Sequence, residues 1–180
     1  MLTLLFSSAL AIPSTLVKRN YMDCSSAPYC GLLVLETGNG SGNYNHPTPA
    51  VHGLWPETGR YGNSGCVGGS KSASIPNVSC YNDYSFQEHE WTAHGVCAAA
   101  DPDTFFNTVC NLSSAPLQMM ADLNSQGYSI DDIASQLGSN GYPVFNIDYN
   151  NAQIELSVCA GSDAVWQIAD VSQFDSVCNY

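Results

Sequence analysis

The sequence predicts one domain of the α+β class, in which helices and strands occupy separate parts of the chain. Its 180 residues, of which 44% are hydrophobic, are enough to bury one core. Helical patterns fill the middle of the chain, whereas strand-like patterns lie near its start and after Pro143. Because the two kinds of element do not strictly alternate, α+β is favoured over a parallel α/β sheet.

Four short apolar runs have the character of strands, bounded by residues that favour turns. They are Leu32–Leu35, Val144–Ile147, Ile154–Val158 and Val165–Ala169. Residues 37–49 and 57–80 are rich in Gly, Asn, Ser and Pro and are predicted to be loops. Trp55–Pro56, which lies between them, is expected to stop regular structure.

Four helices are expected, each preceded by a polar residue or opened by a capping pattern. They run from about Ser85 to Cys97, from Asp101 or Asp103 through Val109, from Ser114 with Pro116 in the first turn, and from Ser129 to Gly138.

The first residues indicate export. An apolar run from Leu2 to Ile12 is too short to span a bilayer, and Ala9–Leu10–Ala11 has the small-residue pattern of a signal-peptide cleavage site. A short segment then ends in the dibasic pair Lys18–Arg19. We therefore expect residues 1–19 to be a signal peptide with a short pro-segment, and residues 20–180 to form a secreted domain. An ordinary first strand is the alternative.

Eight cysteines in a chain of this size imply a disulfide framework formed in an oxidising compartment. They allow about a hundred different pairings, so the sequence alone does not fix the connectivity. Three Asn-x-Ser sequences, at Asn39, Asn77 and Asn111, are expected glycosylation sites in surface loops of an exported chain.

Three of the four histidines lie in two short motifs that also contain tryptophan. The first motif is His52-Gly53-Leu54-Trp55-Pro56-Glu57, and the second is His89-Glu90-Trp91-Thr92-Ala93-His94-Gly95-Val96-Cys97. Histidine takes and gives protons near neutral pH, and two histidines can act together as base and acid. RNA cleavage needs such a pair, because the 2′-hydroxyl must lose a proton and the 5′-oxygen must gain one.

A zinc site is the alternative use of the second motif. Zinc-binding His-Glu-x-x-His helices place their histidines four residues apart, on one face. Here His89 and His94 are five apart, which puts them about 140° apart on a straight α-helix. A metal-free site is therefore favoured, with His52, His89, Glu90 and His94 as its members.

Both motifs resemble the two active-site motifs of the ribonuclease T2 family of acid endoribonucleases, in the family's order. The likeness extends loosely over residues 24–178, including Gly31–Leu35 and Gly141-Tyr142-Pro143. It implies an antiparallel sheet packed with helices and stapled by disulfides. By this resemblance Cys66 pairs with Cys97 and Cys159 with Cys178, whereas the pairing of Cys24, Cys30, Cys80 and Cys110 stays open.

The resemblance also implies roles for single residues. His52 would be the general acid and His94 the general base in forming a 2′,3′-cyclic phosphate, with the roles reversed in its hydrolysis. His89 would contact phosphate, and Glu90 would support the phosphoryl group. Three residues, Trp55, Glu57 and Tyr61, match the first base site, and Phe86 matches the second.

Other aromatic and histidine residues have simpler expected places. Trp91 is expected in the core. His46 lies outside both motifs and is expected to be a hydrogen-bonded core residue or a surface residue.

One position departs from the family pattern. The second motif normally has a lysine directly before its last histidine, and here that position is Ala93. The change removes a positive charge that would stabilise the phosphoryl group. A weakened enzyme, or an inactive relative that acts as a secreted binding protein, is therefore the alternative to an active ribonuclease.

The charge of the chain is unusual for a protein that binds nucleic acid. Loss of Lys18 and Arg19 would leave two basic residues against 16 acidic ones, a formal charge of −14. Weak binding of long RNA is expected, because there is no basic surface to bind phosphates. The negative field is expected to raise the histidine pKa values, so that activity is higher in acid than at neutral pH.

The sequence thus predicts a secreted ribonuclease that cleaves single-stranded RNA with little base specificity. It is expected to be extracellular or vacuolar, to act as a monomer, and to need no cofactor, metal or membrane.

Overall fold

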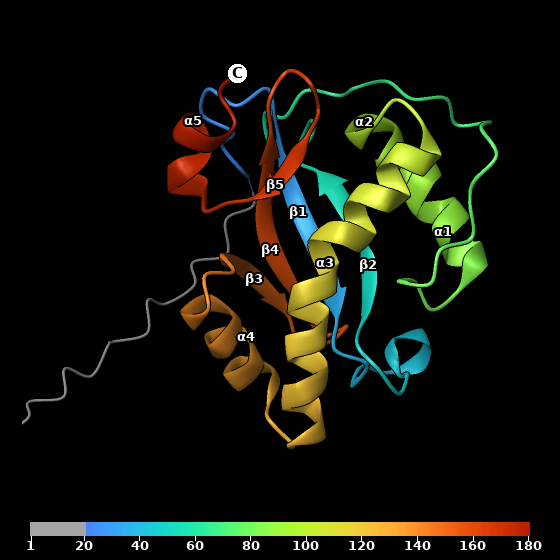
Figure 1. The fold of residues 1–180 in the computed structure, drawn as a ribbon, viewed down its shortest axis with the longest axis vertical. Coiled ribbons are helices and arrows are strands. Elements are labelled where there is room, and N and C mark those ends of the chain that lie inside the picture. Colours follow the sequence, from blue (N-terminus) through green and yellow to red (C-terminus); the bar gives the residue numbers. More distant parts are fainter. Residues whose placement is uncertain (1–20) are drawn as a thin grey trace, which may run out of the picture.

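The computed structural model describes residues 21–180, which form an antiparallel sheet packed with helices (Figure 1). The predicted α+β class is confirmed. Its five strands have the order β2-β1-β4-β3, and β5 also pairs with β4. The strands are β1 (Tyr29–Glu36), β2 (Ala50–Pro56), β3 (Val144–Asp148), β4 (Gln153–Ala160) and β5 (Trp166–Ile168). The predicted signal peptide and pro-segment, residues 1–19, lie outside the described residues.

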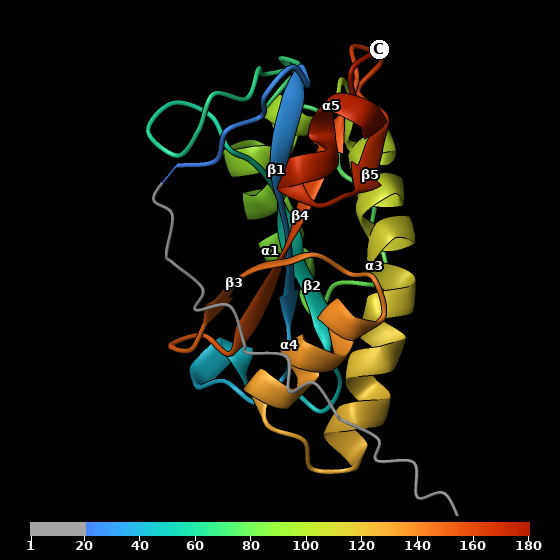
Figure 2. The same ribbon diagram turned by 90° about the vertical axis from the view of Figure 1, so that its left-hand side faces the viewer.

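The helices follow one another between β2 and β3, except for a short last one. They are α1 (Tyr84–Glu90), α2 (Val96–Ala98), α3 (Pro102–Ser125), α4 (Ile130–Ser139) and α5 (Phe174–Val177). A π-helical turn, Trp91–Gly95, joins α1 to α2. Figure 2 shows α3 running along one side of the strands.

The two faces of the sheet have different neighbours, because side chains of a strand alternate between faces. Leu33 and Leu35 of β1 belong to the main core, which they share with the helices. Leu32 and Val34 belong to a smaller core that includes Phe174 of α5. Farther along this second face the strands carry polar residues, since Glu36 of β1 pairs directly with Gln153 of β4.

Two predicted boundaries are wrong. Trp55 and Pro56 do not stop regular structure, because both lie in β2. No separate helix begins at Ser114, because α3 continues through Pro116 to Ser125. The buried residues of this helix, which include Phe106, Val109, Ser113, Pro116 and Met120, recur every three or four positions. Packing of this continuous stripe offsets the backbone hydrogen bond that proline cannot make.

Other predicted helix ends agree closely with the structure. Asp101 caps α3 and Ser129 caps α4 through side-chain hydrogen bonds to backbone amides. Helix α4 ends at Ser139 rather than at Gly138. Gly141, with a φ of 87°, is the residue in the left-handed conformation just beyond its end.

Four disulfides connect the described segments, and they include the two implied pairs, Cys66–Cys97 and Cys159–Cys178. The other four cysteines form Cys24–Cys30 and Cys80–Cys110. Residues 57–80 contain no helix or strand, as predicted, and pass from β2 around to α1 (Figure 1). Two disulfides therefore hold this long loop to the helices.

The three expected glycosylation residues are all exposed. Asn39 and Asn77 lie in loops, but Asn111 lies within α3, so its predicted loop position is wrong.

Candidate active site

His52 is placed by a β-bulge in the pairing of β1 with β2. Val34 lies opposite Gly53 and Leu35 opposite Val51, so His52 is the extra residue between two paired positions. A bulge of this kind redirects a side chain and is common beside active sites. The residue is 7% exposed, which shows that the bulge turns this imidazole into the protein rather than toward solvent.

The His52 ring is held on several sides. Its Nδ1 atom lies 2.7 Å from Glu36 Oε1 and 2.7 Å from Gln153 Nε2. Trp55 and Phe86 contact the ring edge-on, with centroid distances of 4.9 and 4.6 Å. The Nε2 atom points toward Glu90, whose Oε1 is 3.6 Å away. The ring therefore offers Nε2, and not Nδ1, to the second motif.

The second motif owes its geometry to the π-helical turn. Asp83 caps the preceding helix, α1, as its side chain accepts hydrogen bonds from two backbone amides. A π-helix bonds residues five apart, so it brings positions i and i+5 to the same side. The ring centroids of His89 and His94 are 6.3 Å apart. The separation of about 140° expected for a straight helix is therefore wrong, because the helix widens between them.

Trp91 anchors this turn in the core, as predicted. Its side chain is fully buried, and its indole nitrogen donates a hydrogen bond to the Ser70 carbonyl at 3.0 Å. The turn is thereby fixed from its inner side, while His89 and His94 remain on the outer side, exposed and partly exposed.

Glu90 is a fully buried carboxylate that joins the two motifs. Its Oε2 accepts a hydrogen bond of 2.9 Å from Trp55 Nε1, whereas its Oε1 has no hydrogen-bond partner among the described residues. Burial raises the pKa of Glu90 to about 7, although His52 and the Trp55 hydrogen bond act in the opposite direction. In mildly acidic solution Glu90 is therefore a neutral acid that can donate a hydrogen bond.

Gly53 makes room for this carboxylate. A Cβ atom at Gly53 would lie 1.9 Å from Glu90 Oε2 and 2.9 Å from Trp55 Nε1. The glycine of the first motif is thus required by the close approach of the second motif to the backbone of β2.

His94 stacks on Trp55, with a distance of 5.0 Å between the two ring centroids. Burial, followed by the nearby His89 and His52, lowers the pKa of His94 to about 4. The expectation that the acidic charge of the chain raises the histidine pKa values is therefore wrong for His94. Its imidazole is neutral above about pH 4 and can accept a proton.

A cleft of about 1360 Å³ opens beside His94 on the second face of the sheet. Trp55, Glu57 and Tyr61 line it, as the resemblance implies, and so does Ala93. Its other wall is formed by residues 145–150 of β3 and the turn that follows. Burial, and then Glu155, raises the pKa of Glu57 to about 7.

Phe86 does not line this cleft. It lies against the His52 ring and stacks on His89 at a centroid distance of 6.2 Å. Its ring contacts are therefore with His52 and His89, and not with the residues that line the cleft.

The second motif also brings together a possible metal-ligand set. One ligand atom from each of His89, Glu90 and His94 lies within 4.8 Å of the others. Ligand atoms around a tetrahedral zinc ion lie about 3.3 Å apart, a separation that this limit of 4.8 Å allows. The helical spacing that argued against a shared metal does not apply to this turn, because it is not an α-helix.

Sequence reasoning missed the residues that hold His52 from behind. Glu36 and Gln153 lie outside both motifs, on β1 and β4, and only the sheet pairing brings them to the histidine. One signal was present in the sequence, because Glu36 directly follows the apolar run Leu32–Leu35 and so had to end a buried strand.

Comparison with solved structures gives three matching chains, two of which are as follows. "RNase-related protein from Calystegia sepium" is 19% identical, with a TM-score of 0.45 over 80% of this chain and 91% of that one. "RNase NT in complex with 5'-AMP" is 15% identical, with a TM-score of 0.47 over 79% of this chain and 89% of that one. No family model and no curated protein matches the sequence. At this level of likeness, the assignment of a function depends on the site itself.

Replacing Gly53 by alanine should disrupt the contact between the motifs. We expect Gly53→Ala to lower the free energy of unfolding by about 1–3 kcal/mol, because the added carbon overlaps Glu90 Oε2. The Trp55 indole N–H signal in the NMR spectrum should shift as its hydrogen bond is lost. Gly138→Ala is the matched control, since nothing lies within 4 Å of its added carbon in α4, and it should stabilise by up to about 1 kcal/mol. Equal effects of the two substitutions would contradict this account.

Replacing Glu90 by glutamine should stabilise the protein only at high pH. The folded-state pKa of Glu90, about 7, lies above the ordinary value of 4.5, so the folded protein binds this proton more tightly than the unfolded chain. Its contribution to stability is complete below about pH 4.5 and is lost as the pH rises through about 7. Glu90→Gln should therefore unfold like the wild type near pH 4 and be more stable near pH 8, by up to about 3 kcal/mol.

Urea unfolding at both pH values measures this difference. Glu88→Gln, which removes an exposed carboxylate from the same helix, should show no comparable dependence on pH. An equal gain from Glu90→Gln at both pH values would contradict the raised pKa.

Proposed function

We propose that this chain is an endoribonuclease that cleaves single-stranded RNA without a metal, through a 2′,3′-cyclic phosphate. The observation that carries the proposal is the meeting of His52 Nε2, Glu90 and His94 around Trp55, beside a cleft that Trp55 and His94 line. A neutral imidazole, a second imidazole and a protonated carboxyl group are the three functions that this reaction needs.

Each group has one task in the first step. His94, which is neutral above about pH 4, takes the proton of the 2′-hydroxyl. The 2′-oxygen attacks phosphorus, the bond from phosphorus to the 5′-oxygen breaks, and His52 Nε2 gives its proton to that oxygen. In the hydrolysis of the cyclic phosphate a water molecule replaces the 5′-hydroxyl, and the two histidines exchange roles.

Glu90 and His89 would serve the phosphoryl group. Below about pH 7 the Glu90 carboxyl is protonated and can donate from Oε1, the oxygen without a partner, to a phosphoryl oxygen as charge builds there. His89 is exposed beside it and can bind phosphate when it carries a proton. A protonated His89 would supply part of the positive charge that a lysine at position 93 supplies in the family that the motifs resemble.

Base binding would use the cleft. Trp55 and Tyr61 offer aromatic faces on which a base can stack, a contact that tolerates every base. Glu57 can hydrogen-bond to a base edge. Low base specificity is supported by these aromatic faces, because stacking does not distinguish one base from another.

Ala93 favours a second candidate function. It lies exposed on the cleft wall next to His94, and Arg60 is the one lysine or arginine among the residues that line the cleft in the described chain. Without a cation at position 93, the phosphoryl group has weaker support. The second candidate is therefore a ribonuclease-like protein with little or no activity that binds RNA or another ligand in this cleft.

We further propose that residues 1–19 are removed on export and that the remaining chain acts as a monomer outside the cell or in the vacuole. Four disulfides support an oxidising compartment. None of the described helices combines the length and the apolar character needed to cross a membrane.

Cleavage of a short single-stranded RNA in mildly acidic buffer with a chelator tests the function. Wild type should release a cyclic-phosphate product, and His52→Ala and His94→Ala should each lower the rate by about 10²–10⁴-fold. Ala93→Lys should raise the rate, and Glu88→Gln is the control that should leave it unchanged. Activity that is abolished by the chelator would contradict the metal-free mechanism.

The same assay separates the two candidates. Product from Ala93→Lys but none from wild type would indicate a lapsed enzyme. An absence of product from every variant would favour a binding protein.

The dependence of cleavage on pH follows from the two shifted groups. His94 is a base only above about pH 4, and Glu90 is a hydrogen-bond donor only below about pH 7. We therefore expect kcat/KM to rise as the pH passes about 4 and to fall as it passes about 7. An optimum in neutral or alkaline solution would contradict these assignments.

A further inference from the structure

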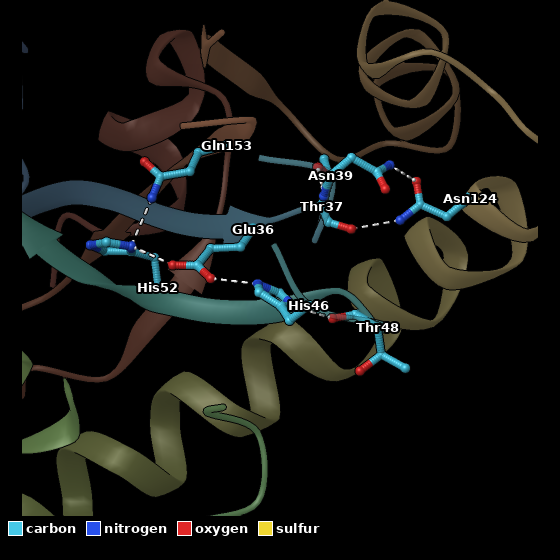
Figure 3. Close-up of polar contacts among 8 residues, drawn as sticks. All are labelled: Glu36, Thr37, Asn39, His46, Thr48, His52, Asn124 and Gln153. Carbon is cyan, nitrogen blue, oxygen red and sulfur yellow. Dashed lines mark hydrogen bonds and ion pairs between the residues drawn. The ribbon is translucent and has the colours of Figure 1, made fainter. Parts of the chain in front are cut away.

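A buried acid connects His52 to a histidine outside both motifs. Glu36 is 5% exposed and lies at the end of β1, between the two rings. Its Oε1 is 2.7 Å from His52 Nδ1, and its Oε2 is 2.8 Å from His46 Nε2 (Figure 3). Both oxygens of one carboxylate are thus engaged by imidazoles.

The far ring nitrogen of His46 fixes its protonation. His46 Nδ1 lies 2.6 Å from the Thr48 carbonyl oxygen, which can only accept a hydrogen bond, so Nδ1 carries a hydrogen. The remaining proton of the pair lies between His46 Nε2 and Glu36 Oε2. Whichever of the two atoms holds it, the His46–Glu36 pair has no net charge. This neutrality makes the burial of the acid acceptable.

The same logic fixes the tautomer of His52. Since Oε1 of Glu36 is an acceptor, His52 Nδ1 carries a hydrogen and donates it. The amide of Gln153 then presents its oxygen, rather than its nitrogen, to Nδ1, an assignment that depends on the hydrogen-bond network. Nε2 of His52, which faces Glu90, is left as the nitrogen that can gain or lose a proton.

The end of β1 is held in place by α3. Asn124 Nδ2 donates to the Thr37 carbonyl at 2.6 Å, and Asn39 Nδ2 donates to Asn124 Oδ1 at 3.1 Å (Figure 3). The residue after Glu36 is therefore tied to a long helix. Together with the pairing of β1 and β4, these hydrogen bonds keep the Glu36 carboxylate between His46 and His52.

We propose that Glu36 and His46 are positioning residues that hold His52 in the Nδ1–H tautomer with Nε2 directed at Glu90. The effect on cleavage rests on the proposed ribonuclease function, but the tautomer does not. When His52 gives up its Nε2 proton, it becomes the neutral Nδ1–H form that Glu36 already binds, so no rearrangement is needed. His46, bound to Thr48, keeps Glu36 turned toward His52.

Nitrogen NMR of the histidine rings in the wild-type protein tests the tautomer without any substitution. In its neutral form, His52 should carry hydrogen on Nδ1 and none on Nε2, and His46 should carry hydrogen on Nδ1. A neutral His52 with its hydrogen on Nε2 would overturn the proposal, whether or not the protein cleaves RNA.

Two substitutions of Glu36 test the consequence for catalysis. Glu36→Leu removes the acceptor and should shift His52 toward the Nε2–H tautomer. It should also lower kcat by at least about tenfold while KM changes by less than about threefold, since the hydrogen bond acts on the reacting nitrogen. Glu36→Gln keeps an acceptor oxygen of the same length and should restore the Nδ1–H tautomer and most of kcat.

His46→Ala should give a smaller loss of kcat than Glu36→Leu, because Glu36 remains but is less well held. Glu88→Gln replaces an exposed acid that does not contact His52, and as the control it should change neither tautomer nor kcat. A Glu36→Leu protein that retains the Nδ1–H tautomer, or that cleaves RNA within about twofold of wild type, would overturn the proposal. Wild-type protein with the expected tautomer but no cleavage would instead contradict the ribonuclease function alone.

Discussion

The burial of the Glu90 carboxylate against the backbone of Gly53 is the constraint on which the arrangement of the site depends. It joins a strand to a helix that is separated from it by a long loop without helix or strand, residues 57–80. Trp55 donates to one oxygen of this carboxylate and stacks on His94, so the contact also positions His94 relative to His52. The two disulfides of the loop and the buried Trp91 keep the helix from moving away.

The site contains two buried acids that the protein treats in opposite ways. Glu36 has an imidazole on each oxygen and Glu90 has one oxygen without a hydrogen-bond partner among the described residues. A buried polar atom without a partner costs free energy, so it is expected where a ligand will supply the partner. The satisfied acid therefore supports His52, and the unsatisfied one is the acid that the proposed reaction would use. The gain in stability expected from Glu90→Gln at high pH is the cost that the proposed function would impose on the fold.

The sequence predicted the class of the fold and the members of the two motifs better than it predicted their geometry. Periodicity located the three strands that follow β2, and a capping residue located the start of α4, because these signals are local. The sequence-based prediction divided α3 at Ser114, because Pro116 is a local signal for a helix start. The buried stripe that keeps α3 continuous depends on tertiary packing, which the local signal does not contain. The bulge at His52 and the π-helical turn before His94 have no local signal, because each exists only through the pairing and packing around it. Glu36 and His46 were missed for the same reason, as strand pairing and a loop bring them together.

The negative charge of the chain is also less of an obstacle than its composition indicates. Glu57 and Glu90, which lie at the cleft and at the site, both have pKa values raised to about 7, chiefly by burial. Below that pH both are neutral, so two negative charges disappear from the region that a phosphate must enter, while the exposed acids elsewhere remain charged. Attraction of RNA over long distances would still be weak, since the chain carries 16 acidic residues and four basic ones. Binding would then depend on stacking and on short contacts in the cleft, which suits short single-stranded substrates better than long or structured ones.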